Sequence, residues 1–198
     1  MPKGFLLILS APSGTGKSTI CQKLLQRRRE VKYSISCTTR APRPGERHGK
    51  HYFFLTTEEF KRKIQRNEFL EWAVVHDQYY GTPRAFIEDA IGEGVCVVLA
   101  IDVQGAAAIR RKISDSVSIF IAPPSLESLK KRLAARHDAS DSVAKRLANS
   151  RGELAQAKTY DYFVVNDDLG SAVSQVDSIL TAESLKVSRR EATVFAAV

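Results

Sequence analysis

The feature that most constrains this 198-residue chain is the junction "FLLILSAPSGTGKST" near its N-terminus. The unbroken apolar run at residues 5 to 9 is typical of a strand covered on both faces of a sheet. A glycine-spaced loop with a lysine follows at once, and then the helical pattern "STICQKLLQRR". A strand, a glycine loop and a helix in this order predict an α/β fold whose loop offers backbone N–H groups to an anion.

The loop matches the phosphate-binding pattern G-x-x-x-x-G-K-[ST] except at its first position, where Ala11 stands in place of glycine. Gly14 and Gly16 allow the backbone to turn its N–H groups inward, and Lys17 can reach the β- and γ-phosphates of ATP. Ser18 offers a hydroxyl to Mg²⁺ and is the predicted metal-binding residue. A simple glycine turn is the alternative, which the strand before the loop and the helix after it disfavour. The predicted ATP-binding loop consists of Ala11, Pro12, Ser13, Gly14, Thr15, Gly16, Lys17, Ser18 and Thr19.

Three further apolar runs, at residues 95–101, 117–122 and 162–166, are separated by helical patterns. This alternation predicts a parallel sheet flanked by helices. Residues 34–82 break the rhythm with short strand patterns, a turn-rich loop and one helix, which indicates a small inserted α+β subdomain. The polar stretch "RHDASDS" suggests a second insertion at residues 132–146. The predicted core is therefore 1–33, 83–131 and 147–184, followed by a partly disordered tail at 185–198.

Composition narrows the partners and the compartment. The formal net charge of +8 favours acidic partners, among them phosphorylated small molecules. The three cysteines form no C-x-x-C pair, which fits reduced thiols in a cytoplasmic protein. No apolar run approaches the roughly 18 residues of a membrane span, and no nucleic-acid-binding module is recognised. We therefore expect a cytoplasmic protein without a membrane or nucleic-acid partner.

A basic and aromatic cluster in "TTRAPRPGERHGKHYFFL", residues 38–55, indicates the second substrate. Arg40 and Arg43 lie three residues apart, and Tyr52 follows on the next predicted strand. Two guanidinium groups and a phenol suit a phosphate monoester, because arginine forks bind phosphate oxygens in pairs. Taken alone, an exposed basic loop would explain the same residues.

This stretch resembles the guanylate kinase family. The family pattern T-[ST]-R-x-x-[KR]-x-x-[DE]-x-x-G-x-x-Y-x-[FY] is matched without a gap by Thr38, Thr39, Arg40, Arg43, Glu46, Gly49, Tyr52 and Phe54. The resemblance continues in order through "FLEW", "YYGT", "IDVQG", "IAPPS", "KKRL", "KRL" and "VNDD". It spans nearly the whole chain except the last dozen residues.

The resemblance implies ATP-dependent phosphorylation of GMP, and of dGMP, to the diphosphate, with Mg²⁺ as cofactor. It also implies a P-loop kinase core, a GMP-binding insertion, a helical lid and a monomer or homodimer. The GMP site would consist of Ser36, Arg40, Arg43, Tyr52, Glu71, Tyr80, Gly81, Thr82 and Asp102. Asn166 and Arg136 would contact ATP, and Lys17, Arg132 and Arg146 would act on the transferring phosphoryl group.

Residue chemistry supports guanine independently of the resemblance. Guanine presents N1–H and an amine as donors, which a carboxylate such as Glu71 accepts, while Ser36 or Thr82 can donate to O6. Adenine would place a bare acceptor against that carboxylate, and such a mismatch supplies discrimination of about 10⁴-fold in sites built to hydrogen-bond their substrate.

One departure and two alternatives remain. Members of the family usually carry an acid two positions before Asp102, near the magnesium-bound waters, whereas this chain has Ala100. A catalytically inactive binding module of the guanylate-kinase-like type would not need Lys17 and the lid arginines, and this chain retains them. A related kinase acting on another phosphorylated acceptor, such as a sugar bisphosphate, would not need Glu71 together with Ser36 and Thr82.

Overall fold

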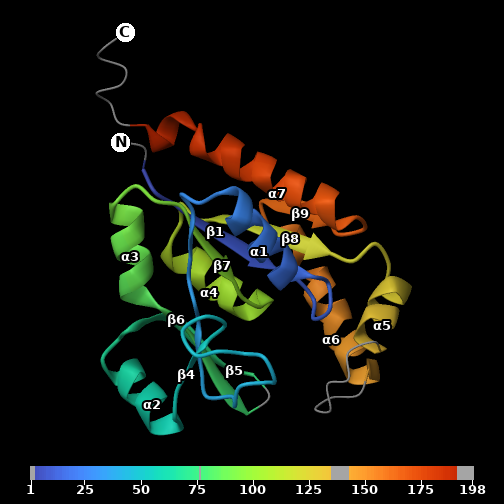
Figure 1. Cartoon of the computed structure of the whole chain (residues 1–198), viewed down its shortest axis with the longest axis horizontal. Helices are drawn as coiled ribbons and strands as arrows, with labels where there is room; N and C mark the ends of the chain where they lie inside the picture. Colours follow the sequence, from blue (N-terminus) through green and yellow to red (C-terminus); the bar gives the residue numbers. More distant parts are fainter. Residues whose placement is uncertain (1–2, 76, 135–142, 191–198) are drawn as a thin grey trace.

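A five-stranded parallel sheet forms the centre of the molecule, in the order β2-β7-β1-β8-β9 (Figure 1). The computed structural model describes residues 3–75, 77–134 and 143–190. The predicted α/β fold with a parallel sheet is confirmed, and the four apolar runs are four of its strands. The strands are β1 (Leu6–Ser10), β2 (Lys32–Tyr33), β7 (Val97–Ala100), β8 (Val117–Ala122) and β9 (Tyr162–Val165).

Helices cover both faces of this sheet, which explains why its strands are apolar without alternation. Leu7 and Leu9 of β1 pack in one cluster with α1 (Lys17–Arg27) and α7 (Leu169–Ser184). Leu6 and Ile8 point the other way and pack with α3 (Arg84–Gly92) and α4 (Val103–Lys112). Successive side chains of a strand face opposite sides, so each β1 residue is buried in one of the two layers.

A smaller four-stranded sheet, in the order β4-β3-β6-β5, is built entirely from the segment between residues 37 and 83. Helix α2 (Thr57–Gln65) covers it through Phe60, whose ring stacks on Phe69 with centroids 4.5 Å apart. The helix begins at a capping box, because Thr56 accepts from the Glu59 backbone and Glu59 accepts from the Thr56 backbone. The strands are β3 (Cys37–Thr38), β4 (Phe53–Phe54), β5 (Phe69–Val75) and β6 (Gln78–Pro83).

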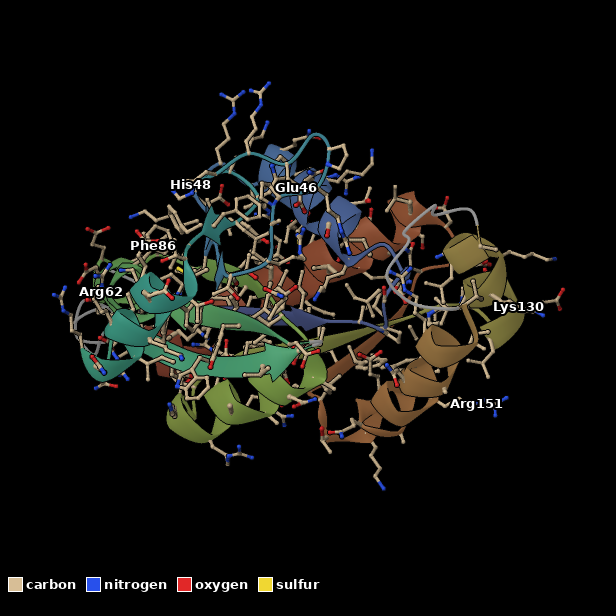
Figure 2. The ribbon with its side chains drawn as sticks, turned by 90° about the horizontal axis from the view of Figure 1, so that it is seen from below. Glu46, His48, Arg62, Phe86, Lys130 and Arg151 are labelled. Atoms are coloured by element: carbon tan, nitrogen blue, oxygen red, sulfur yellow. The ribbon has the colours of Figure 1, made fainter. Side chains whose placement is uncertain are left out.

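Two further helices, α5 (Leu126–Ala134) and α6 (Val143–Ala155), lie side by side at the opposite end of the molecule from the small sheet. Figure 2 shows this separation, with Arg62 and His48 on the small-sheet side and Lys130 and Arg151 on the helical side. A short helix, η1 (Ala157–Thr159), leads from α6 into β9. Of the segment expected to form a lid, residues 135–142 lie outside the described residues.

The start of the expected C-terminal tail is packed against the core. Residues Val187–Arg189 form a short helix, η2, and Arg189 is only 2% exposed. Its guanidinium lies over the Phe5 ring at 4.1 Å and donates to Asp115 Oδ2 at 2.8 Å. The anchor is a buried arginine, so a search for apolar periodicity misses it. Residues 191–198 lie outside the described residues.

Candidate active site

The loop between β1 and α1 has the backbone geometry of an anion site. Gly14 and Gly16 have φ values of 88° and 100°, in the left-handed region that favours glycine. Helix α1 begins directly after Gly16. Backbone N–H groups at a helix N-terminus have no partner within the helix and carry a partial positive charge, which suits phosphate.

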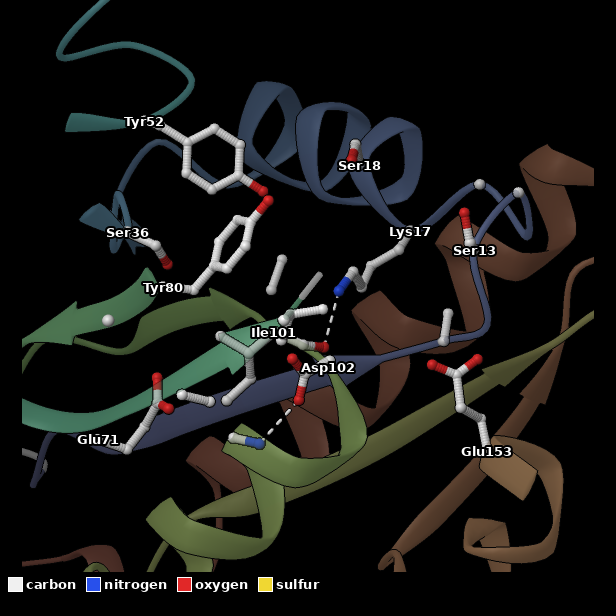
Figure 3. A pocket seen from close by; sticks show the side chains of 18 of the residues that line it. Ser13, Lys17, Ser18, Ser36, Tyr52, Glu71, Tyr80, Ile101, Asp102 and Glu153 are labelled. Carbon is white, nitrogen blue, oxygen red and sulfur yellow. Dashed lines mark hydrogen bonds between the residues drawn. The ribbon is translucent and has the colours of Figure 1, made fainter. Parts of the chain in front are cut away.

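Lys17 opens α1 and points into the site. Its Nζ donates to the Ile101 carbonyl at 2.7 Å, just beyond the end of β7 (Figure 3). Burial lowers the pKa of the Lys17 ammonium, while the acidic groups of Cys21, Asp102 and Glu153 oppose that shift. The ammonium is therefore held beside the loop by a neutral carbonyl, with acidic groups nearby.

A hydrogen-bonded clamp fixes the loop from the far side. Asn166, at the end of β9, donates through Nδ2 to the Thr15 carbonyl at 2.6 Å. Arg132, near the end of α5, donates to the Asn166 carbonyl at 3.0 Å and to the Thr15 carbonyl at 3.4 Å. A Cβ on Gly16 would lie 2.6 Å from the Asn166 amide, so the clamp also requires glycine there.

A cavity of about 320 Å³ extends from the phosphate loop to Glu71 on β5. Glu71 is only 8% exposed, and its Oε1 accepts from the Thr82 hydroxyl at 2.6 Å. Burial raises the pKa of Glu71 to about 7, although the bond from Thr82 lowers it. Gly105 on α4 allows this approach, because a Cβ there would lie 3.2 Å from Glu71 Oε2. The end of the cavity away from Lys17 thus carries a buried carboxylate that is hydrogen-bonded to a hydroxyl.

Two more carboxylates line the same cavity near the phosphate loop. Asp102 caps α4, and its Oδ1 accepts from the backbone N–H groups of Gln104 and Gly105, both at 2.8 Å. Glu153 enters from α6 (Figure 3). Burial raises the pKa of Glu153 to about 7; the charge of Lys17 opposes the rise and that of Asp102 adds to it.

A second cavity, of about 420 Å³, contains the arginines of the insertion. Arg40 Nη2 lies 2.9 Å from both carboxylate oxygens of Glu46, and its guanidinium lies 5.6 Å from the centre of the Tyr52 ring. Glu46 also accepts from the Arg43 backbone N–H at 2.8 Å. One carboxylate therefore organises the loop that carries both arginines.

The two cavities share one wall, formed by Lys17, Ser18, Tyr52, Tyr80 and Ala100. Figure 3 shows the hydroxyl groups of Tyr52 and Tyr80 directed toward one another on the side of the cavity that faces α1. The structure thus brings the phosphate loop, the arginine loop and the Glu71 pocket around connected space.

Most of the predicted site residues lie in this space. The first cavity is lined by Ala11, Ser13, Gly14, Gly16, Lys17, Ser18, Thr19, Ser36, Tyr52, Glu71, Tyr80, Gly81 and Asp102. Arg40 and Arg43 line the second. Pro12, Thr15 and Thr82 are buried behind the walls. Arg132, Arg146 and Asn166 are not among the described residues that line either cavity, and Arg136 lies outside the described residues.

The sequence prediction missed two carboxylates as site residues. Glu46 was part of the matched pattern, and its spacing of three residues from Arg43 is the signal that could have assigned it a role. Glu153 carries no such signal, since a glutamate in a polar helix is ordinarily solvated. Its place in the cavity depends on how α6 packs.

A phosphate loop that shares a cavity wall with an arginine and tyrosine site, on a parallel sheet flanked by helices, defines a P-loop kinase with a phosphorylated acceptor. Comparisons with known proteins narrow this class. The guanylate kinase family model matches residues 3–183. Because the match covers most of the chain, this chain belongs to the guanylate kinase family.

Individual relatives agree with the family model. A guanylate kinase from Symbiobacterium thermophilum is 46% identical over 98% of this chain and 92% of its own length. One from Thermotoga maritima is 47% identical over 96% of this chain and 92% of its own. The crystal structure of guanylate kinase from Anaplasma phagocytophilum superposes with a TM-score of 0.84 at 36% identity, covering 98% of this chain and 93% of that one.

Proposed function

We propose that this chain transfers the γ-phosphoryl group of ATP to GMP, giving ADP and GDP. The observation that carries the proposal is the buried carboxylate of Glu71, which lines the same cavity as Lys17 and accepts from the Thr82 hydroxyl at 2.6 Å. A carboxylate there accepts hydrogen bonds from guanine N1–H and from the exocyclic amine, and the phosphate loop would bind the phosphates of the donor nucleotide. Family membership and the retained Lys17 support an enzyme over an inactive binding module.

Each group of residues has a part in this transfer. Arg40, Arg43, Tyr52 and Tyr80 would bind the GMP phosphate, with Glu46 holding the arginine loop in place. When ATP binds, the Lys17 ammonium would release the Ile101 carbonyl and donate to the phosphates of ATP instead. Phosphoryl transfer needs alignment and charge neutralisation more than a general base. Both nucleotides would therefore meet at the wall that the two cavities share.

The resemblance to the family implies Mg²⁺, and the residues present fit it. Within the described parts of the chain, no group of three or more His, Cys, Asp or Glu side chains could hold a metal alone. The oxygens of Ser18, Asp102 and Glu153 nevertheless line the phosphate end of the cavity. Mg²⁺ is usually bound by one or two protein oxygens together with substrate phosphates and water. When bound, it neutralises charge on the transferring phosphates.

Arg132 and Arg146 are proposed to act when the lid segment closes. In this structure Arg132 donates to the carbonyls of Thr15 and Asn166, so on closure it must either release these carbonyls or reach the phosphoryl group while still bound to them.

Among the described residues no helix is long and apolar enough to cross a membrane. The three cysteines are free thiols, which supports the proposed cytoplasmic location.

The proposal is tested by a coupled ADP-release assay with ATP and Mg²⁺, comparing GMP, dGMP, AMP, CMP and UMP as acceptors. We expect turnover with GMP and dGMP and none with the others. Lys17→Ala should remove turnover while leaving the thermal unfolding transition in place, because Lys17 donates only one hydrogen bond to the rest of the described chain. Turnover by the folded variant would contradict the assignment of the ATP site.

A further inference from the structure

Glu153 is a carboxylate in the phosphate end of the cavity that contacts neither nucleotide in the proposed transfer scheme. It lies on α6 and lines the same cavity as Lys17, Ala100 and Asp102 (Figure 3). Within the described parts of the chain, its carboxylate accepts no hydrogen bond. A partly buried carboxylate without a direct partner is costly unless a cation lies near it.

Lys17 is the only ammonium or guanidinium among the described residues that line this cavity, and it faces two carboxylates there. Asp102 and Glu153 both oppose the effect of burial on its pKa. Burial and the charge of Asp102 both raise the pKa of Glu153, while Lys17 opposes the rise. Two carboxylates and one ammonium thus line the same end of the cavity, and the ammonium Nζ is bound to the Ile101 carbonyl.

Binding of ATP removes the partial neutralisation of these two carboxylates by Lys17. When Lys17 turns to the phosphates, Asp102 and Glu153 remain beside a polyanion, and a second cation is needed in their place. Asp102 uses Oδ1 to cap α4, which leaves its other oxygen available. Ala100, at the end of β7 on the shared wall, offers no oxygen from its side chain. Glu153 is the remaining carboxylate that faces the phosphate end.

We propose that Glu153 is a positioning residue that, together with Asp102, accepts hydrogen bonds from the water molecules of the divalent cation that accompanies ATP. This role rests on the proposed function. It explains how a cavity wall with Ala100 still presents two carboxylates to the metal. It also places one of them on α6.

The test measures metal binding directly. Electron paramagnetic resonance of free Mn²⁺ gives its affinity for the complex of the protein with β,γ-imido-ATP, a non-transferable analogue. Glu153→Gln should weaken Mn²⁺ binding about tenfold, the lower end of the effect of removing an outer-shell partner. Analogue binding in EDTA should be unchanged or tighter, because a negative charge is lost beside the phosphates. Glu127→Gln, an exposed glutamate on α5 with 77% side-chain exposure, is the matched control and should leave both values unchanged.

The outcomes separate this inference from the proposed function. Unchanged Mn²⁺ affinity in folded Glu153→Gln would overturn the inference. A loss of analogue binding in EDTA as large as the loss with Mn²⁺ would also overturn it, because Glu153 would then act on Lys17 alone. Glu153→Asp keeps the charge on a shorter arm and should give an intermediate loss, which keeps the test decisive if the amide variant does not fold. Failure of the wild-type protein to phosphorylate GMP, with Mn²⁺ bound normally, would contradict the proposed function instead.

Discussion

The Glu71 carboxyl shows how one residue's surroundings set both recognition and pH dependence. Because burial raises its pKa to about 7, it is largely protonated in the free protein below that pH. The protonated carboxyl cannot accept from both guanine donors. We expect the dissociation constant of GMP, measured by calorimetry without ATP, to rise as the pH falls below 7, with the deprotonation of Glu71 alone contributing about tenfold for each pH unit well below its pKa.

Protonation of Glu71, which weakens GMP binding, stabilises the folded protein. In the unfolded chain a glutamate titrates near 4.5, whereas folded Glu71 titrates near 7. Between these values the folded protein binds more protons, so lowering the pH through this window contributes stability while it weakens GMP binding. Glu71→Gln is the control, since its GMP profile should retain only the titration of the phosphate, whose second pKa is about 6. Identical profiles for variant and wild type would contradict the assignment.

At the scale of elements, the phosphate loop depends on a strand and a helix that lie far away in the sequence. Asn166 at the end of β9 and Arg132 on α5 meet at the Thr15 carbonyl. We expect Asn166→Ala to raise the KM for ATP about tenfold, the cost of one lost hydrogen bond to a buried carbonyl. The KM for GMP should stay within a factor of two, since Asn166 lies outside both cavities. Steady-state kinetics with each nucleotide varied in turn measures both.

Asp167→Ala changes the exposed neighbour of Asn166 and is the control for a general effect on this turn. An equal rise in both KM values of Asn166→Ala would mean that the clamp maintains the whole site rather than the ATP loop. No change in either value would show that Arg132 alone holds the loop.

These elements also show how far the sequence could predict the fold and the site. Strands β1, β7, β8 and β9 were predicted because burial on both faces leaves an uninterrupted apolar run, which is a local property. The phosphate loop was predicted because glycine spacing encodes its backbone angles locally. The clamp of Arg132, Asn166 and Thr15 was not predicted, because it joins residues up to 151 positions apart. The position of Glu153 likewise depends on the packing of α6, which no local pattern specifies.

At the scale of the whole molecule, the two ends of the described chain are joined by a buried ionic cluster. Arg189 contacts Phe5, Asp115 and Glu183, and the Lys3 N–H donates to the Arg189 carbonyl at 2.8 Å. Glu183 is 1% exposed and also accepts from the Tyr162 hydroxyl at 2.5 Å. The cluster therefore ties together the segment before β1, the loop before β8, strand β9 and the end of α7.

Breaking this cluster should destabilise the fold without altering the site. Arg189→Met removes one of the two cations beside buried Glu183 and leaves Lys186, whose Nζ lies 2.8 Å from Glu183 Oε1. The loss of a hydrogen bond to a charged group costs about 2 kcal/mol and lowers Tm by roughly 4–8 °C for a chain of this size. Arg189→Met with Glu183→Gln should recover at least half of that loss, because the buried carboxylate that lost its arginine is then gone. Arg151→Met, the same change at an exposed position on α6, should leave Tm unchanged. Thermal unfolding followed by circular dichroism measures all three. A double variant no more stable than Arg189→Met would show that the lost packing on Phe5, rather than the lost ion pair with Glu183, accounts for the destabilisation.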